Sequence, residues 1–399
     1  MPPAREPHTP LRVGVYADLV YRRLGEATGT DRAFVLFVLG LAERVDELVL
    51  FGRLHPEEGP SPYRVDERAR HVPLPHYPKV TDVVGVLRAM RGTVAKIRRE
   101  AGALDVVWIF GPYPISVLVA AALRRAGVPL VLGVRQDFPA YVRSRLPGRG
   151  WAWAVPAARL LELAFRLLAR RAPTVVVGEA LAARYRGGRA PVLATGFSLI
   201  RTDDVAAEAE ALARAPREPL RILTVGRIDA EKNPLLLPEI LVELRSRGIE
   251  SELTVVGSGP LEAELRARAA ELGVALDLRG YVPAGAELWR LYREADVFLH
   301  VSLTEGLPQV LYEARAAGLP VVATEVGGVR AALEDGEGGL LVPPRDAAAA
   351  AVAVACLARE PELRERLIRR GLAAARAETA DVQLDAILPL LRAAAISSA

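Results

Sequence analysis

The chain of 399 residues has almost no cysteine, and Cys356 is the only one. An intramolecular disulfide is therefore excluded, and nothing ties the protein to an oxidising compartment. No apolar run reaches the ~18 residues that span a bilayer, because charged residues interrupt even the apolar segment Val155–Ala169. The first residues, Met1–Pro10, lack the apolar stretch of a signal peptide. These absences predict a cytoplasmic protein.

Histidine is also scarce, and the spacing of the few present does not fit a metal-ligand cluster. The histidines are His8, His55, His71, His76 and His300. The sequence also lacks an Asp-x-Asp motif, which fits our expectation that the protein requires neither a metal nor a cofactor. His300 ends a predicted strand, where it either faces a ligand or has a structural role.

Apolar residues and arginine are abundant. Hydrophobic residues make up 51% and charged residues 25% of the chain, which is typical of a well-packed soluble protein, and the length predicts two or three domains. Residues 1–195 hold 29 basic and 17 acidic residues, a net charge of +12, whereas residues 196–399 have a net charge of −8. The basic half suits an anionic acceptor or an anionic membrane surface. The alternative is an arginine-rich surface without a ligand, since only three of the 52 basic residues are lysine.

Short apolar runs alternate with helical patterns in both halves of the chain, which is typical of parallel sheets covered on both faces. We predict strands at 11–16, 47–51, 105–110, 129–134, 174–177, 220–225, 252–256, 276–279, 296–301, 320–323 and 339–342. We predict helices at 30–42, 114–127, 154–171, 234–247, 260–272, 286–294 and 308–317. The expected fold class is therefore α/β, with two Rossmann-like, doubly wound domains facing across a cleft.

The domain boundaries follow from composition. Residues 1–195 form the first predicted domain and residues 220–375 the second. Residues 196–219 are polar, charged and proline-containing, which predicts a linker. Residues 376–399 are expected to form a helix that packs back on the first domain.

Ligands of such folds bind beyond the carboxyl ends of the strands, so the loops there are the candidate sites. The loop from Gly226 to Pro234 follows a predicted strand and opens a helix that Asn233 would cap. Gly226 lets the backbone turn, while Arg227 and Lys232 lie beside the helix N-terminus. Two cations and a helix dipole suit a diphosphate. Two solvated surface charges are the alternative.

Later loops offer glycines and acids. Gly257 begins a Gly-Ser-Gly turn that would allow a ligand to approach the backbone, although the third glycine of a dinucleotide fingerprint is missing. Glu305 lies just before a predicted helix, and Glu313 is eight positions further on the same side. Carboxylates bind sugar and ribose hydroxyls well, and the amides of Gly306 and Leu307 are free at the helix start. A capping role for Glu305 and a surface position for Glu313 are the alternatives.

Together these segments resemble the C-terminal domain of glycosyltransferase family 4, whose members have the GT-B architecture. The resemblance is carried, in order, by Val225–Arg227, Lys232–Pro234, Val255–Pro260, Gly280–Val282, Ala295–Val297, Ser302–Glu313, Gly318–Thr324, Gly327–Gly328 and Leu341–Asp346. The pair of glutamates is the most specific of these marks. The likeness is close over residues 195–375 and only general in the first half.

The resemblance implies roles for the matching residues. Arg227 and Lys232 would bind the diphosphate of the donor and stabilise the charge of the leaving group. Glu305 would contact the donor sugar, with the amides of Gly306 and Leu307 nearby.

The resemblance also implies the remaining donor contacts. Glu313 would hold the ribose hydroxyls, and Tyr281 and Val282 would line the base pocket. The family transfers sugars with retention of configuration and generally without a metal. Two cations at the diphosphate can replace a metal there.

The first half departs from the family pattern. Residues 17–25 contain one glycine and two arginines where many members have a glycine-rich loop. Arg135 or Gln136 stands where many members have a histidine. Asp137 is the nearest group that could accept a proton or bind an acceptor hydroxyl, and a turn-forming acid is its alternative role.

Aromatic and basic residues of the first half leave two further questions. Trp108 and Phe110 either stack on a sugar or fill the core. A segment rich in arginine and tryptophan either docks on an anionic membrane or forms an ordinary amphipathic helix. It contains Arg143, Arg145, Arg149, Trp151, Trp153, Arg159, Arg166, Arg170 and Arg171.

We therefore predict a retaining, metal-independent glycosyltransferase. It would move a sugar from a UDP or GDP sugar to a hydroxyl of a saccharide or lipid-linked acceptor, with possible contact to the inner membrane surface and no nucleic-acid partner. A sugar-nucleotide epimerase of the same architecture and a non-catalytic sugar-nucleotide-binding partner are the alternatives.

Overall fold

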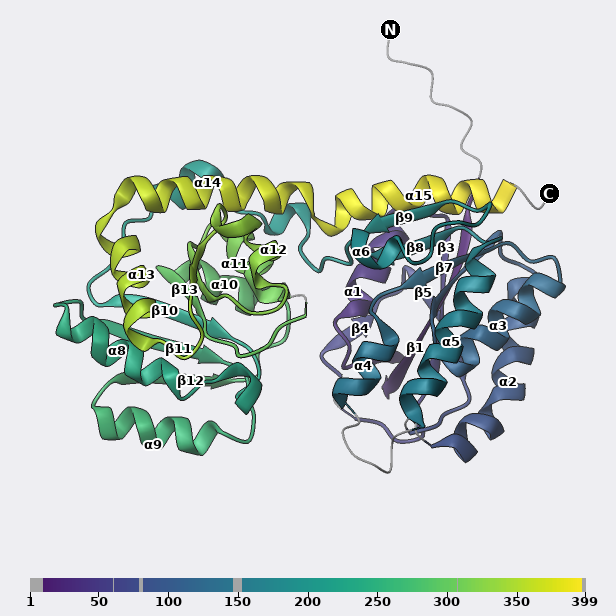
Figure 1. Cartoon of the computed structure of the whole chain (residues 1–399). Helices are drawn as coiled ribbons and strands as arrows, with labels where there is room; N and C mark the ends of the chain where they lie inside the picture. Colours follow the sequence, from purple (N-terminus) through teal and green to yellow (C-terminus); the bar gives the residue numbers. More distant parts are fainter. Residues whose placement is uncertain (1–9, 60, 79–81, 146–152, 307, 397–399) are drawn as a thin grey trace, which may run out of the picture. The chain divides into compact units, whose positions relative to one another are not determined.

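The computed structural model describes residues 10–59, 61–78, 82–145, 153–306 and 308–396. The chain divides into two compact units (Figure 1): unit 1 comprises residues 1–199 and 380–399, and unit 2 comprises residues 200–379. A largely parallel sheet with helices on both faces forms the centre of each unit. The α/β class with two parallel-sheet domains, as expected from the sequence, is confirmed.

Unit 1 is built from the following elements. Its strands are β1 (Arg12–Leu24), β2 (Ala27–Thr30), β3 (Glu47–Leu54), β4 (Tyr63–Val65), β5 (Ala69–Leu74), β6 (Val106–Gly111), β7 (Leu130–Val134), β8 (Thr174–Val177) and β9 (Val192–Thr195). Its helices are α1 (Phe34–Leu39), η1 (Gly40–Glu43), α2 (Val83–Ala101), α3 (Pro114–Arg125), α4 (Phe138–Arg145), α5 (Ala154–Ala169), α6 (Glu179–Ala182) and α15 (Ala380–Ile396).

The parallel strands of unit 1 lie in the order β5-β3-β1-β6-β7-β8-β9. β1 runs well beyond the predicted strand, because an irregularity between Tyr16 and Val20 lets it continue, pair with β3 again and form an antiparallel hairpin with β2. Asp18 lies in this irregularity with a φ of 49°. The segment where the family often has a glycine-rich loop is therefore a strand extension here.

Helices cover both faces of the unit 1 sheet. Side chains from α2, α3 and α5 form one core with the strands. α1 and α15 lie on the other face, where Trp108 and Phe110 are fully buried and pack with the rings of Phe34 and Phe197. Of the two roles considered for Trp108 and Phe110, the structure shows the core-filling one.

The last helix, α15, belongs to unit 1 although it follows unit 2 in the chain. It contacts β6 and β7, and the side-chain oxygen of Gln383 accepts a hydrogen bond of 2.8 Å from the amide of Ser198. Arg44 of unit 1 forms ion pairs with Asp381 at 3.1 Å and Asp385 at 2.7 Å. The helix thus forms part of the unit 1 fold.

Unit 2 repeats the strand–helix alternation. Its strands are β10 (Leu220–Val225), β11 (Ser251–Val256), β12 (Ala275–Gly280), β13 (Val297–His300), β14 (Val321–Thr324) and β15 (Leu340–Val342). Its helices are η3 (Thr202–Asp204), α7 (Glu208–Ala213), η4 (Ala230–Lys232), α8 (Leu236–Ser246), α9 (Glu262–Leu272), α10 (Ala286–Glu294), α11 (Gln309–Ala316), α12 (Val329–Ala332), η5 (Glu334–Gly336), α13 (Ala347–Arg359) and α14 (Pro361–Ala377).

The strands of unit 2 are parallel and lie in the order β12-β11-β10-β13-β14-β15. α8, α9 and α13 pack on one face of the sheet, and α10, α11 and α12 pack on the other. All strand ends that carry the candidate donor loops therefore lie at one edge.

Two local expectations differ from the structure. Residues 200–219, predicted as linker, belong to unit 2 because Ala206 and Ala211 are buried against Ile368 and Leu372 of α14. Asn233 does not cap the N-terminus of a helix. It has a φ of 50° and follows the end of η4, whereas α8 begins only at Leu236.

Candidate functional site

Glu305 occupies the centre of a polar cluster at the carboxyl edge of the unit 2 sheet. Its Oε1 accepts a hydrogen bond of 2.8 Å from Ser302 Oγ, and the same oxygen lies 2.8 Å from His300 Nε2. Lys232, from the loop after β10, forms an ion pair with the same oxygen. The backbone amide of Leu303 also donates to the carbonyl of Glu231 at 2.8 Å, so the loops after β10 and β13 are held together.

The charge of Glu305 is strongly stabilised. Burial by itself raises the pKa of this carboxyl, but hydrogen bonds and electrostatic attraction from His300 and Lys232 outweigh the burial and lower the pKa to about 2. The carboxylate is therefore ionised at neutral pH, so both of its oxygens act only as hydrogen-bond acceptors.

Arg227 lies on the same loop but in a different environment. Its guanidinium pairs with Asp229 and with Glu231, the latter at 2.7 Å, and half of its side chain is exposed. Lys232 is less exposed. Both cations of the predicted diphosphate site are thus paired with carboxylates, Arg227 within its own loop and Lys232 with Glu305. An anion would compete with these acids for the two cations.

Glycines allow these loops to approach one another closely. A Cβ on Gly257, whose φ is +141°, would overlap the carbonyl oxygen of Gly226. A Cβ on Gly327 or Gly328 would overlap the carbonyl oxygens of Glu305 and Gly306, respectively, and the amide of Gly328 donates to the Glu305 carbonyl at 3.2 Å. These glycines are therefore required for backbone-to-backbone packing that positions Glu305.

Glu313 lies in the second turn of α11 and has a different partner from Glu305. Its Oε2 accepts a hydrogen bond of 2.7 Å from the hydroxyl of Tyr292, which comes from α10. Burial raises the pKa of Glu313, and the hydrogen bond from Tyr292 opposes this only in part. Glu313 is partly buried and bonded to a neighbouring helix, so it is not the freely exposed surface residue considered from the sequence.

The predicted base-pocket residues follow β12. Tyr281 is 59% exposed, and Val282 packs against the core beneath α10. The carbonyl of Gly280, which precedes them, accepts a hydrogen bond of 2.7 Å from the amide of Gly257. The amide of Leu307 lies outside the described residues, as do Arg149 and Trp151 and the side chain of Arg145.

Asp137, the candidate base of the first half, is engaged in local structure. Its Oδ1 accepts a hydrogen bond of 3.0 Å from the amide of Ala140 at the start of α4. Its Oδ2 is 2.6 Å from Arg184, which also pairs with the buried Glu162. These contacts fit the helix-starting acid that was its alternative role.

Sequence reasoning left His300 undecided and gave Ser302 no role. Both contact the Glu305 carboxylate, and His300 is only 4% exposed. The sequence feature that could have indicated this contact is the position of His300 at the carboxyl end of β13, just before the loop that carries Glu305.

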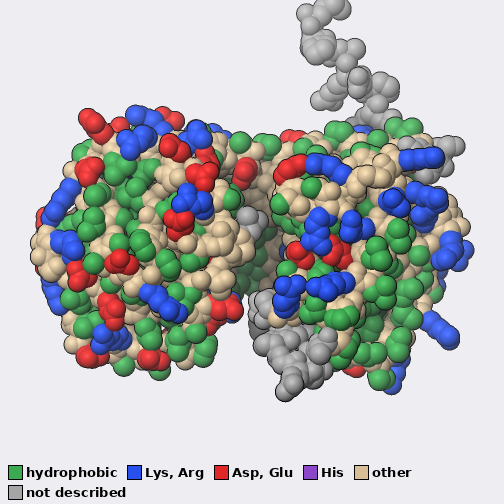
Figure 2. Space-filling model, in the orientation of Figure 1, with side chains coloured by type: hydrophobic (Ala, Val, Ile, Leu, Met, Phe, Trp, Pro, Cys, Tyr) green, Lys and Arg blue, Asp and Glu red, His purple; other side chains and the backbone are tan. Residues whose placement is uncertain are grey.

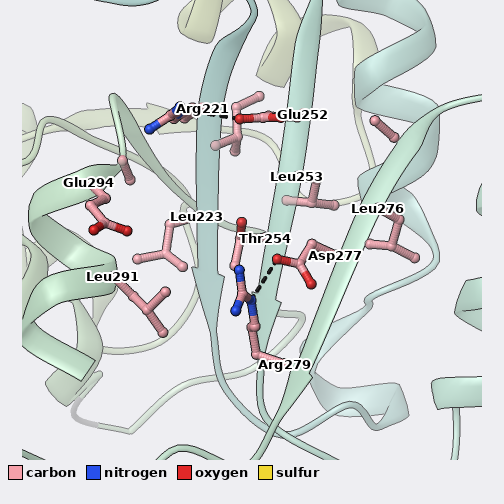
Figure 3. Close-up of a pocket in the computed structure, with 13 residues that line it drawn as sticks. Arg221, Leu223, Glu252, Leu253, Thr254, Leu276, Asp277, Arg279, Leu291 and Glu294 are labelled. Carbon is pink, nitrogen blue, oxygen red and sulfur yellow. Dashed lines mark hydrogen bonds and ion pairs between the residues drawn. The ribbon is translucent and has the colours of Figure 1, made fainter. Parts of the chain in front are cut away.

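A pocket of unit 2 lies apart from these loops. It has a volume of about 410 Å³ and lies over the strands β10, β11 and β12 beside α10. Figure 3 shows two rim ion pairs, Arg221 with Glu252 and Arg279 with Asp277, around an apolar floor that includes Leu223 and Leu291. Its cations are neutralised by neighbouring acids, and it contains none of the candidate donor residues.

Comparisons with known proteins match both units. The model of "Glycosyl transferases group 1" matches residues 208–373, and that of "Glycosyl transferase 4-like domain" matches residues 28–195. An amylovoran biosynthesis glycosyltransferase of Erwinia amylovora is 39% identical over 148 residues, covering 35% of this chain and 36% of that protein. A D-inositol 3-phosphate glycosyltransferase of Streptomyces avermitilis is 37% identical over 238 residues, covering 55% of this chain and 51% of that protein. The matches thus span about a third to a half of these relatives.

A solved structure shares the fold over nearly the whole chain. The protein HepE of Anabaena, in a crystal structure with UDP, has a TM-score of 0.63 and 17% identity, covering 98% of this chain and 100% of that one. At this identity the likeness shows the fold alone. Within the described parts of the chain, no helix is long and apolar enough to cross a membrane.

Proposed function

This chain belongs to the group 1 glycosyltransferases of the GT-B fold, and from that premise we propose that it transfers a sugar from a nucleoside-diphosphate sugar to a hydroxyl of a saccharide or lipid-linked acceptor. The observation that carries the proposal is the cluster of Glu305, Lys232, His300 and Ser302 at the carboxyl edge of the unit 2 sheet. It places a carboxylate and a cation side by side, as a donor that combines sugar hydroxyls with a diphosphate requires.

We assign the donor contacts as follows. Lys232 and Arg227 would bind the diphosphate and stabilise the negative charge that develops as it leaves. Glu305 would accept hydrogen bonds from the donor sugar. Glu313 would accept them from the ribose, in exchange for or in addition to the hydroxyl of Tyr292.

The reaction would proceed with retention of configuration and without a metal. The acceptor hydroxyl would attack the anomeric carbon on the face from which the diphosphate departs. The C–O bond to the acceptor forms as the C–O bond to the diphosphate breaks, and the acceptor proton passes to the departing diphosphate. Asp137 would not be needed as a base, which agrees with its engagement by Arg184.

The donor proposal is tested by calorimetric titration with UDP, GDP, ADP and dTDP, with and without EDTA. We expect tight binding of UDP or GDP that EDTA leaves unchanged. A requirement for a divalent cation would contradict the metal-free mechanism, and binding of none of the four would contradict the donor site. Product analysis separates the alternatives, because an epimerase alters the sugar without an acceptor and a binding partner consumes no donor.

A lipid-linked acceptor at an anionic membrane is supported by α5. Its outward residues combine apolar and basic side chains without an exposed acid: Trp153, Arg159, Leu160, Leu163, Arg166, Leu167 and Arg170. The only acid of the helix, Glu162, is buried in its ion pair with Arg184. Figure 2 shows basic and hydrophobic side chains interspersed over the visible face of unit 1. Apolar side chains that enter a bilayer beside arginines that meet its phosphates are typical of interfacial helices.

The membrane proposal is tested by co-sedimentation with vesicles of phosphatidylcholine alone or mixed with phosphatidylglycerol. We expect binding to the anionic vesicles only, and loss of that binding in L160E/L163E. Val352→Glu, at an exposed apolar position of unit 2, is the matched control and should bind as the parent does. Equal binding of parent and L160E/L163E would refute a role for α5.

A further inference from the structure

Arg135 follows β7 at the carboxyl edge of the unit 1 sheet and stacks on an aromatic ring. The guanidinium carbon lies 3.4 Å from the centroid of the Phe34 ring. Burial lowers the pKa of Arg135 to about 10, so the group is still charged at neutral pH. Among the residues that the structure describes, no carboxylate forms an ion pair or hydrogen bond with it.

Arg53 of the same unit shows the contrast. It lies on β3 and pairs with the buried carboxylate of Asp18 at 3.0 Å. A partly buried charge without such a partner loses hydration that nothing replaces. Arg135 therefore has the unmet requirement for an anion that Arg53 does not have.

The groups around Arg135 are also hydrogen-bond donors. The phenol of Tyr113, which follows β6, and the guanidinium of Arg32 are the neighbours that act electrostatically on Arg135. Arg32 is exposed and forms an ion pair of 3.4 Å with Asp31, which is also exposed. Burial raises the pKa of Tyr113, so its hydroxyl stays protonated and can donate. α3 begins at Pro114, so the positive end of its dipole lies at the same edge. Two guanidinium groups and a phenol hydroxyl match the oxygens of a phosphate.

We propose that Arg135, assisted by Tyr113 and Arg32, binds a phosphate group of the acceptor, so that the acceptor is a phosphorylated saccharide or a lipid phosphate. This rests on the proposed transfer reaction and narrows its acceptor class. Arg135 is then a specificity-determining residue that holds the acceptor by its charged end.

The first test measures binding to the full chain by calorimetry, with glucose 1-phosphate and glucose as one matched pair and farnesyl phosphate and farnesol as the other. We expect each phosphate to bind more tightly than its neutral match. Arg135→Gln should weaken phosphate binding roughly 10- to 100-fold, the range for a charge-assisted hydrogen bond. Tighter binding of farnesyl phosphate identifies a lipid source, and tighter binding of glucose 1-phosphate a soluble one.

Two control variants locate the anion. Arg125→Gln removes an exposed charge at the far end of α3 and should bind phosphate as the parent does. Arg227→Ala removes a charge of the donor loop and should also leave this binding unchanged. The proposal is overturned if neither phosphate binds the parent protein, or if binding falls in Arg227→Ala and not in Arg135→Gln.

A stability measurement separates binding from a structural role. Without phosphate, Arg135→Gln should melt at the same temperature as the parent or higher, because the variant loses a partly buried charge that has no acidic partner among the described residues. Arg135→Lys, which keeps the charge, should keep part of the phosphate affinity. A lower melting temperature of Arg135→Gln with unchanged phosphate affinity would show a structural arginine. UDP and GDP binding, measured on the same variants, reports on the transferase proposal separately.

Discussion

Glu305 depends on neighbours that come from two strand ends, and this dependence sets what single substitutions should do. His300, at the end of β13, and Ser302, in the loop that follows, contact the Glu305 carboxylate. Lys232 contacts it from the loop after β10. Arg227 stands apart, paired with acids of its own loop. At the scale of residues, the proposed donor site therefore combines a carboxylate with three polar contacts, Glu305, and a half-exposed cation, Arg227.

Removal of either cation should weaken binding of the diphosphate but not of the base and ribose. We expect Arg227→Ala and Lys232→Ala to lower the affinity for a nucleoside diphosphate roughly 10- to 100-fold, as for a lost charge-assisted hydrogen bond. The affinity for the nucleoside should not change. Calorimetry with both ligands measures this, with Arg266→Ala, an exposed arginine of α9, as control. Parallel losses for nucleoside and nucleoside diphosphate would contradict the assignment.

The Glu305 carboxylate should also contribute to stability in a pH-dependent way. Its pKa is about 2 in the folded protein against 4.5 ordinarily, so its contribution is fully present above pH 4.5 and is lost as the pH falls towards 2. We expect Glu305→Gln to unfold at lower urea concentration than the parent at pH 7, and the difference to shrink below pH 4.5. A difference that stays constant from pH 7 to pH 3 would show that the low pKa is not the cause.

Glu313 should contribute through the ribose. Its carboxyl is held by Tyr292 on α10, and the proposed contact adds hydrogen bonds from the ligand. We expect Glu313→Gln to cost about 1–3 kcal/mol of binding free energy for any ribonucleotide that binds, which is the range for hydrogen bonds to charged groups and unsatisfied partners. Titration of the matched 2′,3′-dideoxyribonucleotide should show no such loss. Equal affinity of parent and variant for the ribonucleotide would mean that Glu313 is structural.

At the scale of elements, the backbones of the loops after β13 and β14 pack directly against each other, because glycine leaves no side chain between them. Gly327 has a φ of +51° and faces the carbonyl oxygen of Glu305. Gly336 also has a positive φ, +100°, but its nearest neighbour would be 3.9 Å from an added Cβ. The two positions differ in crowding while sharing a backbone conformation that favours glycine.

This contrast predicts different outcomes for the same substitution. Gly327→Ala should shift the loop that carries Glu305, lowering donor affinity and costing more than the ~1 kcal/mol of a strained backbone alone. Gly336→Ala should cost only that strain and leave donor affinity unchanged. Urea unfolding and nucleotide titration of both variants check this. Identical losses of donor affinity would show that crowding against Glu305 is not responsible.

At the scale of the whole molecule, chain order and unit membership differ. α15 follows unit 2 in the sequence but buries Leu384, Ile387 and Leu391 in unit 1. The stability of unit 1 therefore depends on α15, a helix that follows unit 2 in the chain.

Substitutions in the two cores should affect different unfolding transitions. Ile387→Ala in α15 and Leu244→Ala in α8 each remove a fully buried side chain and should cost about 2–5 kcal/mol. In calorimetry, Leu244→Ala should lower the transition of unit 2 and Ile387→Ala the transition of unit 1. If both variants lower the same transition, the units do not unfold separately.

The sequence by itself determined the α/β class and the positions of most strands of unit 2, because buried parallel strands must be short, apolar and bounded by turn residues. It also predicted which loops follow the carboxyl ends of strands, since the segments that carry Arg227, Lys232 and Glu305 follow β10 and β13. Their role in donor binding stays a prediction. The long β1 and its hairpin could not be predicted, because they depend on pairing with β2 and β4 rather than on periodicity.

Only the tertiary structure decided which partners each side chain has. His300 reaches Glu305, Glu313 reaches Tyr292, and Asp137 reaches Arg184 across 5, 21 and 47 residues of sequence, respectively. Likewise, the sequence placed Arg135 at a strand end, but only the fold shows that none of the described carboxylates pairs with it. Hydrogen bonds and ion pairs act over a few ångströms, and sequence spacing does not determine which distant groups come that close.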